Sequence, residues 1–299
     1  MTVRPGDGAR TWPSVAVVVA AAAVGLAVAH AGPGITGIGP VRMRAFRRLA
    51  GQGNPGHVAL TFDDGPDPSS TPEFAQVLAD RNVRATFFML GSMVARAPRL
   101  AADIAAAGHE VGVHGWDHRY LPARSPRATR SDLTRAAELI ADVTGTPPRL
   151  FRPPYGVLSG PALLVARDLG LTPVLWGAWG REWAPGATSD SVLHTLLGGL
   201  DGGVTVLLHD SGCTSPSGAW QAGLAAVPLL LDECDRRGLA VGPLGEHGIP
   251  GLAARAHAPA VTRRGPGARA GLAQRPADPT GRLAAIARSA SRFPARPHD

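Results

Sequence analysis

The chain has 299 residues, of which 44% are hydrophobic and 18% are charged. This length fits one large domain or two small ones, and the hydrophobic share excludes a wholly disordered chain. The presence of only two cysteines excludes a disulfide-dense scaffold and a zinc site made of four thiolates.

The net charge of +7 is concentrated at the C-terminal end of the chain. Residues 251–299 carry nine arginines and two aspartates, whereas acidic and basic residues balance over 1–250. Nucleic-acid binding requires a basic stripe on a folded face, so we expect no nucleic-acid partner. Hydrophobic periodicity ends near residue 250, and we expect residues 249–299 to form a disordered, arginine-rich tail.

Residues 1–31 have the pattern of an export segment. Arg4 and Arg10 precede an apolar stretch over 15–29, and the sequence Ala-His-Ala follows at 29–31. This pattern is typical of a secretory signal peptide, and a retained membrane anchor is the alternative. Either reading places the protein outside the cytoplasm. Residues 32–54 are rich in glycine and proline, and we expect them to be a linker.

Over residues 55–248, short apolar or β-branched runs alternate with helical patterns. The runs predict seven strands, at residues 57–62, 85–90, 110–114, 149–152, 172–176, 204–209 and 239–241. The helical patterns span residues 72–79, 98–107, 131–143, 161–168, 189–200 and 220–237. Alternating strands and helices indicate a mostly parallel sheet, either a barrel of TIM type or an open doubly wound sheet.

Polar and aromatic residues gather where these predicted strands end. They are Asp63, Asp64, His114, Arg152, Trp176, His209 and Asp210. In a parallel barrel the active site is built at the carboxyl ends of the strands, so this rim is the candidate site.

Asp64, His114 and His118 form a candidate metal-binding set. Residues four apart meet on one face of a helix, which gives the two histidines metal-ligand spacing. A set of two histidines and one carboxylate suits Zn²⁺ or another divalent transition ion holding a reactive water. His209 follows a buried run, and it is either a structural histidine or a proton donor on the same rim.

Four stretches resemble the motifs of one enzyme family. Thr61-Phe62-Asp63-Asp64-Gly65-Pro66-Asp67 is similar to the first motif of the polysaccharide deacetylases, the NodB-homology group of carbohydrate esterases (family 4). The second, third and fifth motifs resemble His114-Gly115-Trp116-Asp117-His118, Arg152-Pro153-Pro154-Tyr155-Gly156 and Leu207-Leu208-His209. The resemblance covers about residues 55–245 and implies a distorted (β/α)7 barrel, in agreement with the seven predicted strands.

The resemblance also implies a role for each matching residue. Asp64, His114 and His118 would bind one divalent metal ion, with Zn²⁺ expected and Co²⁺ or another transition ion as alternatives. Asp63 would be the general base toward the metal-held water, and Arg152 would keep it ionised. His209 would protonate the departing amine. The implied substrate-binding residues are Pro153, Tyr155 (through its backbone N–H at the oxyanion), Trp183 and Leu207.

The fourth motif departs from the family pattern. The family has an aspartate four residues before the motif's tryptophan, where it orients the arginine, and that position here is Trp179, counted from Trp183. Glu182 could reach Arg152 instead, or it could be an ordinary loop acid. Trp179 itself suits either sugar stacking or packing. The two cysteines, Cys213 and Cys234, could pair or remain free thiols.

These observations predict an exported, monomeric, metal-dependent hydrolase that removes N-acetyl groups from amino sugars of a cell-wall or chitin-like polysaccharide. A membrane would be a second partner if the N-terminal segment is retained. One alternative is a deacetylase of another N-acyl or O-acetyl substrate, such as xylan. Another is a wall-binding protein with a disabled site, which only the altered fourth motif favours.

Overall fold

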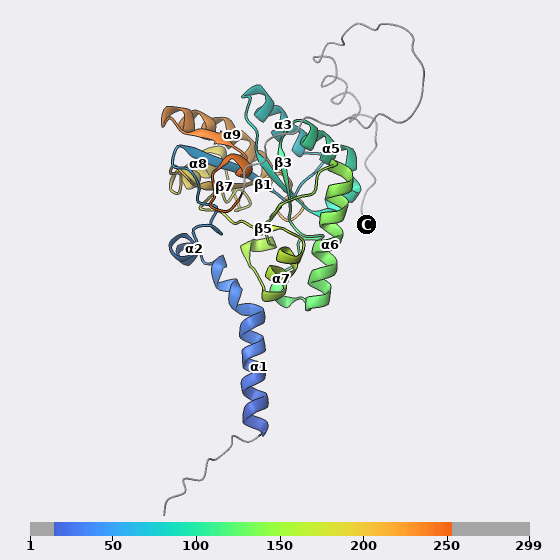
Figure 1. Cartoon of the computed structure of the whole chain (residues 1–299). Coiled ribbons are helices and arrows are strands. Elements are labelled where there is room, and N and C mark those ends of the chain that lie inside the picture. Colours follow the sequence, from blue (N-terminus) through green and yellow to red (C-terminus); the bar gives the residue numbers. More distant parts are fainter. Residues whose placement is uncertain (1–14, 253–299) are drawn as a thin grey trace, which may run out of the picture. The chain divides into compact units, whose positions relative to one another are not determined.

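The structure, a computed structural model, describes residues 15–252. Most of the predicted tail, from residue 253 onward, and the basic residues before the apolar stretch lie outside the described residues. Within the described part, the strands lie at the centre of the domain and helices surround them (Figure 1).

The centre of the domain is a parallel sheet of eight strands. Seven of them follow one another in the order β5-β4-β3-β2-β1-β7-β6 and curl into a half-barrel, and β8 pairs with the first residues of β1. The strands are β1 (His57–Asp63), β2 (Thr86–Met89), β3 (Glu110–Val113), β4 (Leu150–Phe151), β5 (Thr172–Pro173), β6 (Ala178–Trp179), β7 (Thr205–His209) and β8 (Ala240–Gly242). The predicted α/β fold with a distorted, TIM-like barrel is confirmed.

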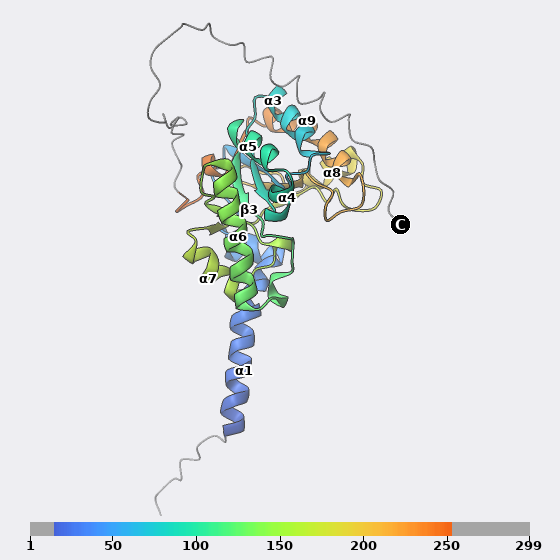
Figure 2. The same ribbon diagram turned by 90° about the vertical axis from the view of Figure 1, so that its right-hand side faces the viewer.

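Helices connect the strands and cover the sheet. The α-helices are α1 (Val15–Ala31), α2 (Gly39–Ala45), α3 (Thr71–Asp80), α4 (Gly91–Arg96), α5 (Pro98–Ala106), α6 (Pro126–Thr144), α7 (Gly160–Asp168), α8 (Ser189–Leu197) and α9 (Ala219–Arg236). Four short 3-10 helices are η1 (Gly32–Gly37), η2 (Leu121–Ala123), η3 (Pro154–Gly156) and η4 (Leu244–Glu246). Figures 1 and 2 show α6 and α7 on one flank of the sheet and α8 and α9 on the other.

Three elements differ from their sequence predictions: the start of α6, the strand β6 and the short helix α4, which no helical pattern predicted. Helix α6 begins at Pro126 and not at residue 131, because Ser125 caps it and proline suits the first turn. Its first turns are rich in arginine and lack apolar periodicity. Strand β6 was not predicted, because its two residues are too few to form a pattern, and only pairing with β7 defines it.

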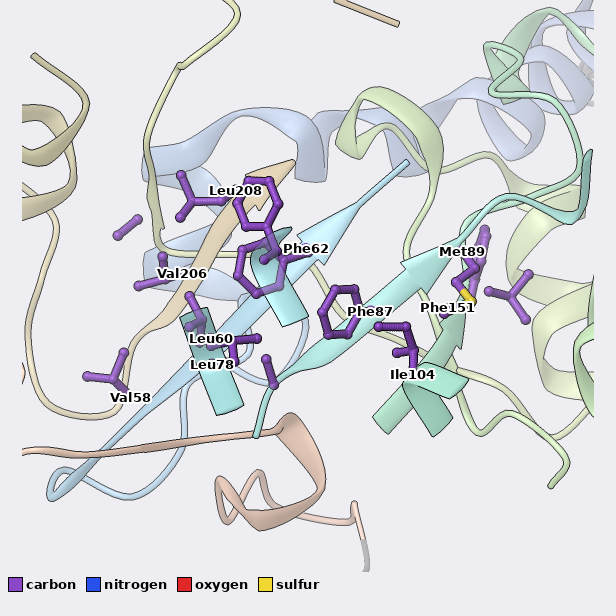
Figure 3. Close-up of a cluster of buried hydrophobic side chains, with 14 of the residues drawn as sticks. Val58, Leu60, Phe62, Leu78, Phe87, Met89, Ile104, Phe151, Val206 and Leu208 are labelled. Carbon is purple, nitrogen blue, oxygen red and sulfur yellow. The ribbon is translucent and has the colours of Figure 1, made fainter. Parts of the chain in front are cut away.

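The main core lies between β1 and its neighbours and the helices outside them. Six of the seven residues of β1 are buried, as expected for a strand covered on both faces. The Phe62 ring stacks on Phe87 with centroids 5.0 Å apart, and Leu60, Leu78 and Val206 pack around them (Figure 3). This packing fixes the central strands, whose carboxyl ends carry the polar residues.

The linker prediction for residues 32–54 is wrong, because the structure folds this segment against the domain. Arg42 on α2 is 4% exposed, and its Nε and Nη1 donate to the carbonyl oxygens of Trp176 and Thr36 at 3.1 and 2.9 Å. The guanidinium also lies over the Trp176 ring, 5.1 Å from its centre. Gly and Pro are typical of linkers, but here prolines stand in the first turns of η1 and α2, where they favour helix starts.

Helix α1 is apolar and exposed. Val19–Gly37 has the length and hydropathy needed to cross a membrane, with a mean hydropathy of 1.5 and 6% of the tested window buried. Val24 and Leu26 are 64% and 73% exposed. The predicted signal or anchor segment is therefore an apolar helix that the domain does not cover.

Candidate active site

The carboxyl ends of four strands bring the predicted catalytic residues together. Asp63 ends β1 and Asp64 follows it, His114 follows β3, Arg152 follows β4, and His209 ends β7. Since β1 pairs with β7 and lies two strands from β3, their ends share one rim of the half-barrel. The arrangement confirms that the polar strand ends predicted from the sequence lie close together.

Asp64, His114 and His118 converge on one point. The Oδ1 atom of Asp64 lies 3.3 Å from Nε2 of His114 and 3.5 Å from Nε2 of His118. Asp64 is fully buried, His114 is 2% exposed, and the three residues form a group that could hold a metal ion.

The geometry of this group fits a divalent metal. Oδ1 of Asp64 is buried and has no hydrogen-bond partner within the described residues, which is costly for a carboxylate unless a cation binds it. Ligands at about 2.1 Å in a tetrahedral zinc site lie about 3.4 Å apart, close to the separations observed. The donor set and its spacing therefore match a zinc-type ion.

Neighbouring groups orient two of these ligands. Nδ1 of His114 lies 2.8 Å from the carbonyl oxygen of Arg152, which can only accept a hydrogen bond. Nδ1 therefore carries the proton, and the lone pair of Nε2 faces Asp64. The hydroxyl of Thr214 donates to Oδ2 of Asp64, a contact that no sequence pattern indicated.

The two histidines meet on a loop and not on a helix, which corrects the sequence argument. β3 ends at Val113, and the chain then turns through Gly115 (φ 91°) and His118 (φ 54°). The loop is held where the backbone N–H of Trp116 donates to Oδ1 of Asp132 at 2.9 Å. Left-handed backbone at His118 is unfavourable for a residue with a Cβ and is typical of functional sites.

The ionisation of Asp64 and His118 suits metal binding near neutral pH, whereas at His114 burial is outweighed by the charges of Asp63 and Asp64, which raise the pKa. Burial raises the pKa of Asp64, but the adjacent imidazoles of His114, His209 and His118 outweigh burial and lower it below its usual range. Burial and the neighbouring His114 lower the pKa of His118 to about 4. An ionised carboxylate and a neutral imidazole are the forms that bind metals.

Arg152 holds Asp63 in place beside this set. Nη1 of Arg152 donates to Oδ1 of Asp63 and to the hydroxyl of Thr61, at 2.8 and 2.7 Å. Nε and Nη2 donate to the carbonyl oxygens of Val174 and Leu175, and the side chain is fully buried. Oδ2 of Asp63 lies 3.8 Å from Nε2 of His114, so this carboxylate faces the candidate metal site.

Glu182 contacts His209 and not Arg152, which decides the alternative that the sequence left open. Oε1 of Glu182 lies 2.7 Å from Nδ1 of His209 and accepts the backbone N–H of His209 at 2.6 Å. Arg152 is oriented instead by the backbone carbonyls of Val174 and Leu175. Burial disfavours the imidazolium, but the charge and hydrogen bond of Glu182 outweigh it and raise the pKa of His209 to about 9.

Asp210 is a buried residue of the rim for which no sequence pattern predicts a role. It accepts a hydrogen bond from Thr71, and burial raises its pKa to about 7. A Cβ at Gly65 would lie 2.2 Å from Oδ2 of Asp210, so glycine is required after the two aspartates. Asp210 thereby fixes the turn that places Asp63 and Asp64.

The predicted substrate-binding residues lie around this centre in different environments. The Tyr155 ring is 60% exposed and packs edge-on against His118 at 4.4 Å, and Pro153 before it is buried. The Trp183 ring lies 5.0 Å from His209, whereas Leu207 is buried with Leu175 and Trp176. Cys213 and Cys234 are both free thiols.

Two cavities open beside the centre. One of about 730 Å³ adjoins His118 and Tyr155, and its other lining residues are Asp117, Arg119, Tyr120, Ala123 and Arg124. The other, of about 420 Å³, lies beyond Glu182 and Trp183, where α8 and α9 begin. Trp179, which is 39% exposed, packs edge-on against Trp183. Aromatic rings and polar side chains around a cavity are typical of binding sites for polar organic ligands.

Comparisons with known proteins agree with this site. The family model described as polysaccharide deacetylase matches residues 50–174. A chitooligosaccharide deacetylase of Bradyrhizobium sp. (strain ANU 289) is 35% identical over 196 residues, which cover 62% of this chain and 88% of that protein. The chain therefore belongs to the polysaccharide deacetylase family, the carbohydrate esterase family 4 group with NodB homology.

Solved structures show the same fold. A peptidoglycan N-acetylglucosamine deacetylase superposes with a TM-score of 0.62 at 28% identity, covering 68% of this chain and 93% of that one. A pseudoenzyme of the same family from Bacillus anthracis superposes with a TM-score of 0.59 at 25% identity, covering 66% and 67%. The family thus includes active deacetylases and a protein described as inactive, and the residues of the site must decide between them.

Proposed function

We propose that this chain is a metal-dependent hydrolase that removes N-acetyl groups from the amino sugars of a cell-wall or chitin-like polysaccharide. One observation carries the proposal: the rim that holds the candidate metal ligands Asp64, His114 and His118 also carries a carboxylate paired with arginine, Asp63, and a histidine paired with glutamate, His209. A base and an acid at one centre are what amide hydrolysis requires.

Asp64, His114 and His118 would hold one divalent ion, and Zn²⁺ fits the donor set best. Such an ion would act as a Lewis acid that polarises the acetyl carbonyl and lowers the pKa of water. The protein supplies the remaining steps through its own side chains and backbone.

Asp63 acts as the general base in this proposal. Its carboxylate takes a proton from the attacking water as the water oxygen bonds to the acetyl carbon. Arg152 holds this carboxylate in place through a charge-assisted hydrogen bond from Nη1 to Oδ1. The backbone N–H of Tyr155 would stabilise the negative charge that develops on the carbonyl oxygen.

His209 acts as the general acid. With a pKa of about 9, it is protonated at neutral pH and can donate from Nε2, because Glu182 holds Nδ1. The proton passes to the amide nitrogen as the C–N bond breaks, and the products are acetate and the free amine. Because the carbonyl oxygens of Val174 and Leu175 orient Arg152 without the missing aspartate, the altered fourth motif does not favour a disabled site.

Acetate release from N-acetylglucosamine oligomers tests the proposal. The full chain is stripped of metal and then supplied with Zn²⁺ or Co²⁺, and activity should return with about one ion per chain. Asp63→Asn should retain the metal and lose turnover, while Asp142→Asn on the exposed side of α6 should change neither. Release from acetylated xylan alone would identify an O-acetyl esterase, and bound metal without any release would indicate a binding protein.

A further inference from the structure

The end of α1 packs against loops that form one wall of the site. Nε2 of His30 lies 2.9 Å from the carbonyl oxygen of Pro122 in η2. A Cβ at Gly160, the first residue of α7, would lie 2.1 Å from the carbonyl oxygen of Ala29. Only glycine permits so close an approach. Figures 1 and 2 both place α7 beside the end of α1 that enters the domain.

Helix η1 continues directly from α1 and packs against η3, which carries Tyr155. A Cβ at Gly34 or at Gly37 would lie 3.3 Å from the side chain of Val157, just after η3. The membrane-length segment Val19–Gly37 includes η1. No flexible spacer therefore separates the apolar segment from the wall of the site.

Exposed apolar side chains surround this junction. They are Ile35 (54% exposed), Ile38 (53%), Tyr120 (49%), Leu163 (37%) and Leu164 (53%). Each lies on a segment that contacts α1 or is continuous with it: η1 and its C-cap, the N-cap of η2, and the first turn of α7. We call these five residues the foot surface. A group of exposed apolar residues next to an uncovered apolar helix indicates an apolar partner shared by both.

We propose that α1 is a retained membrane anchor and that the foot surface lies against the lipid bilayer. Lipid is the expected partner because the foot surface is continuous with the membrane-length segment Val19–Gly37. Tyr120 fits this position because tyrosine favours the membrane interface. Arg119 pairs with Asp117 through Nε at 3.0 Å, and its side chain is 67% exposed, so its remaining N–H groups can reach lipid phosphates.

If the chain has the proposed function, the position of the foot surface also indicates where its substrate lies. The rings of Tyr120 and Tyr155 lie 6.1 Å apart, and Tyr155 packs against His118. The cavity that these three residues line therefore opens next to the foot surface. Its substrate would be an acetylated glycan held at the membrane surface, and not one distant from it.

Fluorescence quenching in liposomes tests the contact with the bilayer. The full chain is reconstituted in a Cys213→Ser background, and a dye is attached at Leu164→Cys or, as the matched control, at Leu229→Cys on α9. Leu229 is an exposed leucine (39%) of α9, and Figures 1 and 2 place α9 away from α7. A lipid-tethered quencher should reduce emission about threefold more at position 164, as expected for an interfacial side chain. Equal quenching at the two positions would overturn the proposed face.

Mass measurement of the membrane-derived protein tests retention of the anchor. The expected species includes residues 15–31, whereas a chain that begins at residue 32 would contradict retention. The quenching measurement and the mass measurement do not depend on catalytic activity.

Acetate release from two matched oligomers tests the substrate consequence. One oligomer is attached to lipid in the same vesicles and the other is soluble. The wild-type ratio of kcat/KM should favour the attached oligomer, and Leu163→Glu with Leu164→Glu should lower this ratio by about fivefold, because local concentration is lost. A ratio unchanged by the double variant would reject the consequence. No release from either oligomer would contradict the proposed function and leave the quenching result standing.

Discussion

Nδ1 of His209 lies 2.7 Å from Oε1 of Glu182, and both side chains are shielded from solvent. The glutamate comes directly before Trp183 of the fourth motif, and it pairs with His209 and not with Arg152. It also ties the loop after β6 to the end of β7, because the same oxygen accepts the backbone N–H of His209. One carboxylate therefore sets both the position and the protonation of the proposed acid.

Glu182→Gln should move the basic limb of the pH–kcat profile to lower pH by about one unit or more, equivalent to about 1.4 kcal/mol per unit. His209 is protonated below its pKa of about 9, and loss of the negative charge lowers that pKa. kcat should therefore fall more at pH 8.5 than at pH 6.5. Glu138→Gln on the exposed face of α6 is the control, and an unshifted limb in Glu182→Gln would contradict the role of the pair.

The same pair should make stability depend on pH. The folded pKa of His209 is raised from 6.5 to about 9. Its contribution to the free energy of unfolding is therefore complete below about pH 6.5 and is lost as the pH rises through about 9. Urea unfolding of wild type and Glu182→Gln across this range should show the difference between them shrinking with rising pH. A constant difference would be inconsistent with this linkage.

Arg152→Met should lower the free energy of unfolding by about 3–5 kcal/mol, because it leaves the buried carboxylate of Asp63 without its counter-ion. The double variant Arg152→Met with Asp63→Asn should recover part of that loss. The exposed pair of Arg130 and Asp168 offers a matched control, since Arg130→Met should cost less than about 1 kcal/mol. Equal effects at the two arginines, measured by urea unfolding, would refute the argument.

Zn²⁺ should stabilise the protein by about 2.7 kcal/mol at a free concentration one hundred times its Kd, seen as a rise in Tm. Asp64→Asn should abolish both the rise and the bound metal, since it removes the charged ligand between His114 and His118. Asp142→Asn should behave as wild type. A full Tm response in Asp64→Asn would place the metal elsewhere.

Arg42→Met should destabilise the folded domain by about 2 kcal/mol or more, because the buried carbonyl oxygens of Trp176 and Thr36 lose a charged donor. Arg44→Met, on the exposed side of the same helix, should have little effect. The measurement is urea unfolding of the full chain. Equal stability of the two variants would show that the hydrogen bonds of Arg42 do not stabilise the folded domain.

Much of the architecture could be predicted because each strand of this sheet is a local pattern. Residues 58–62 and 204–208 are buried, as in strands covered on both faces, and continuous apolar runs reveal such strands. Strand β6 and the first turns of α6 escaped prediction for the opposite reason. Their residues carry no periodic signal, and contacts with β7 and the cap at Ser125 define them.

The sequence by itself determined which residues end the strands and hence which side chains could share one rim. Parallel strands align their carboxyl ends, so Asp63, Asp64, His114 and His209 had to approach one another once the sheet formed. Which side chains pair with each other was decided only by the tertiary structure. Glu182 pairs with His209, and Arg42 is buried by residues far along the chain, because such contacts depend on loop paths that no local pattern encodes.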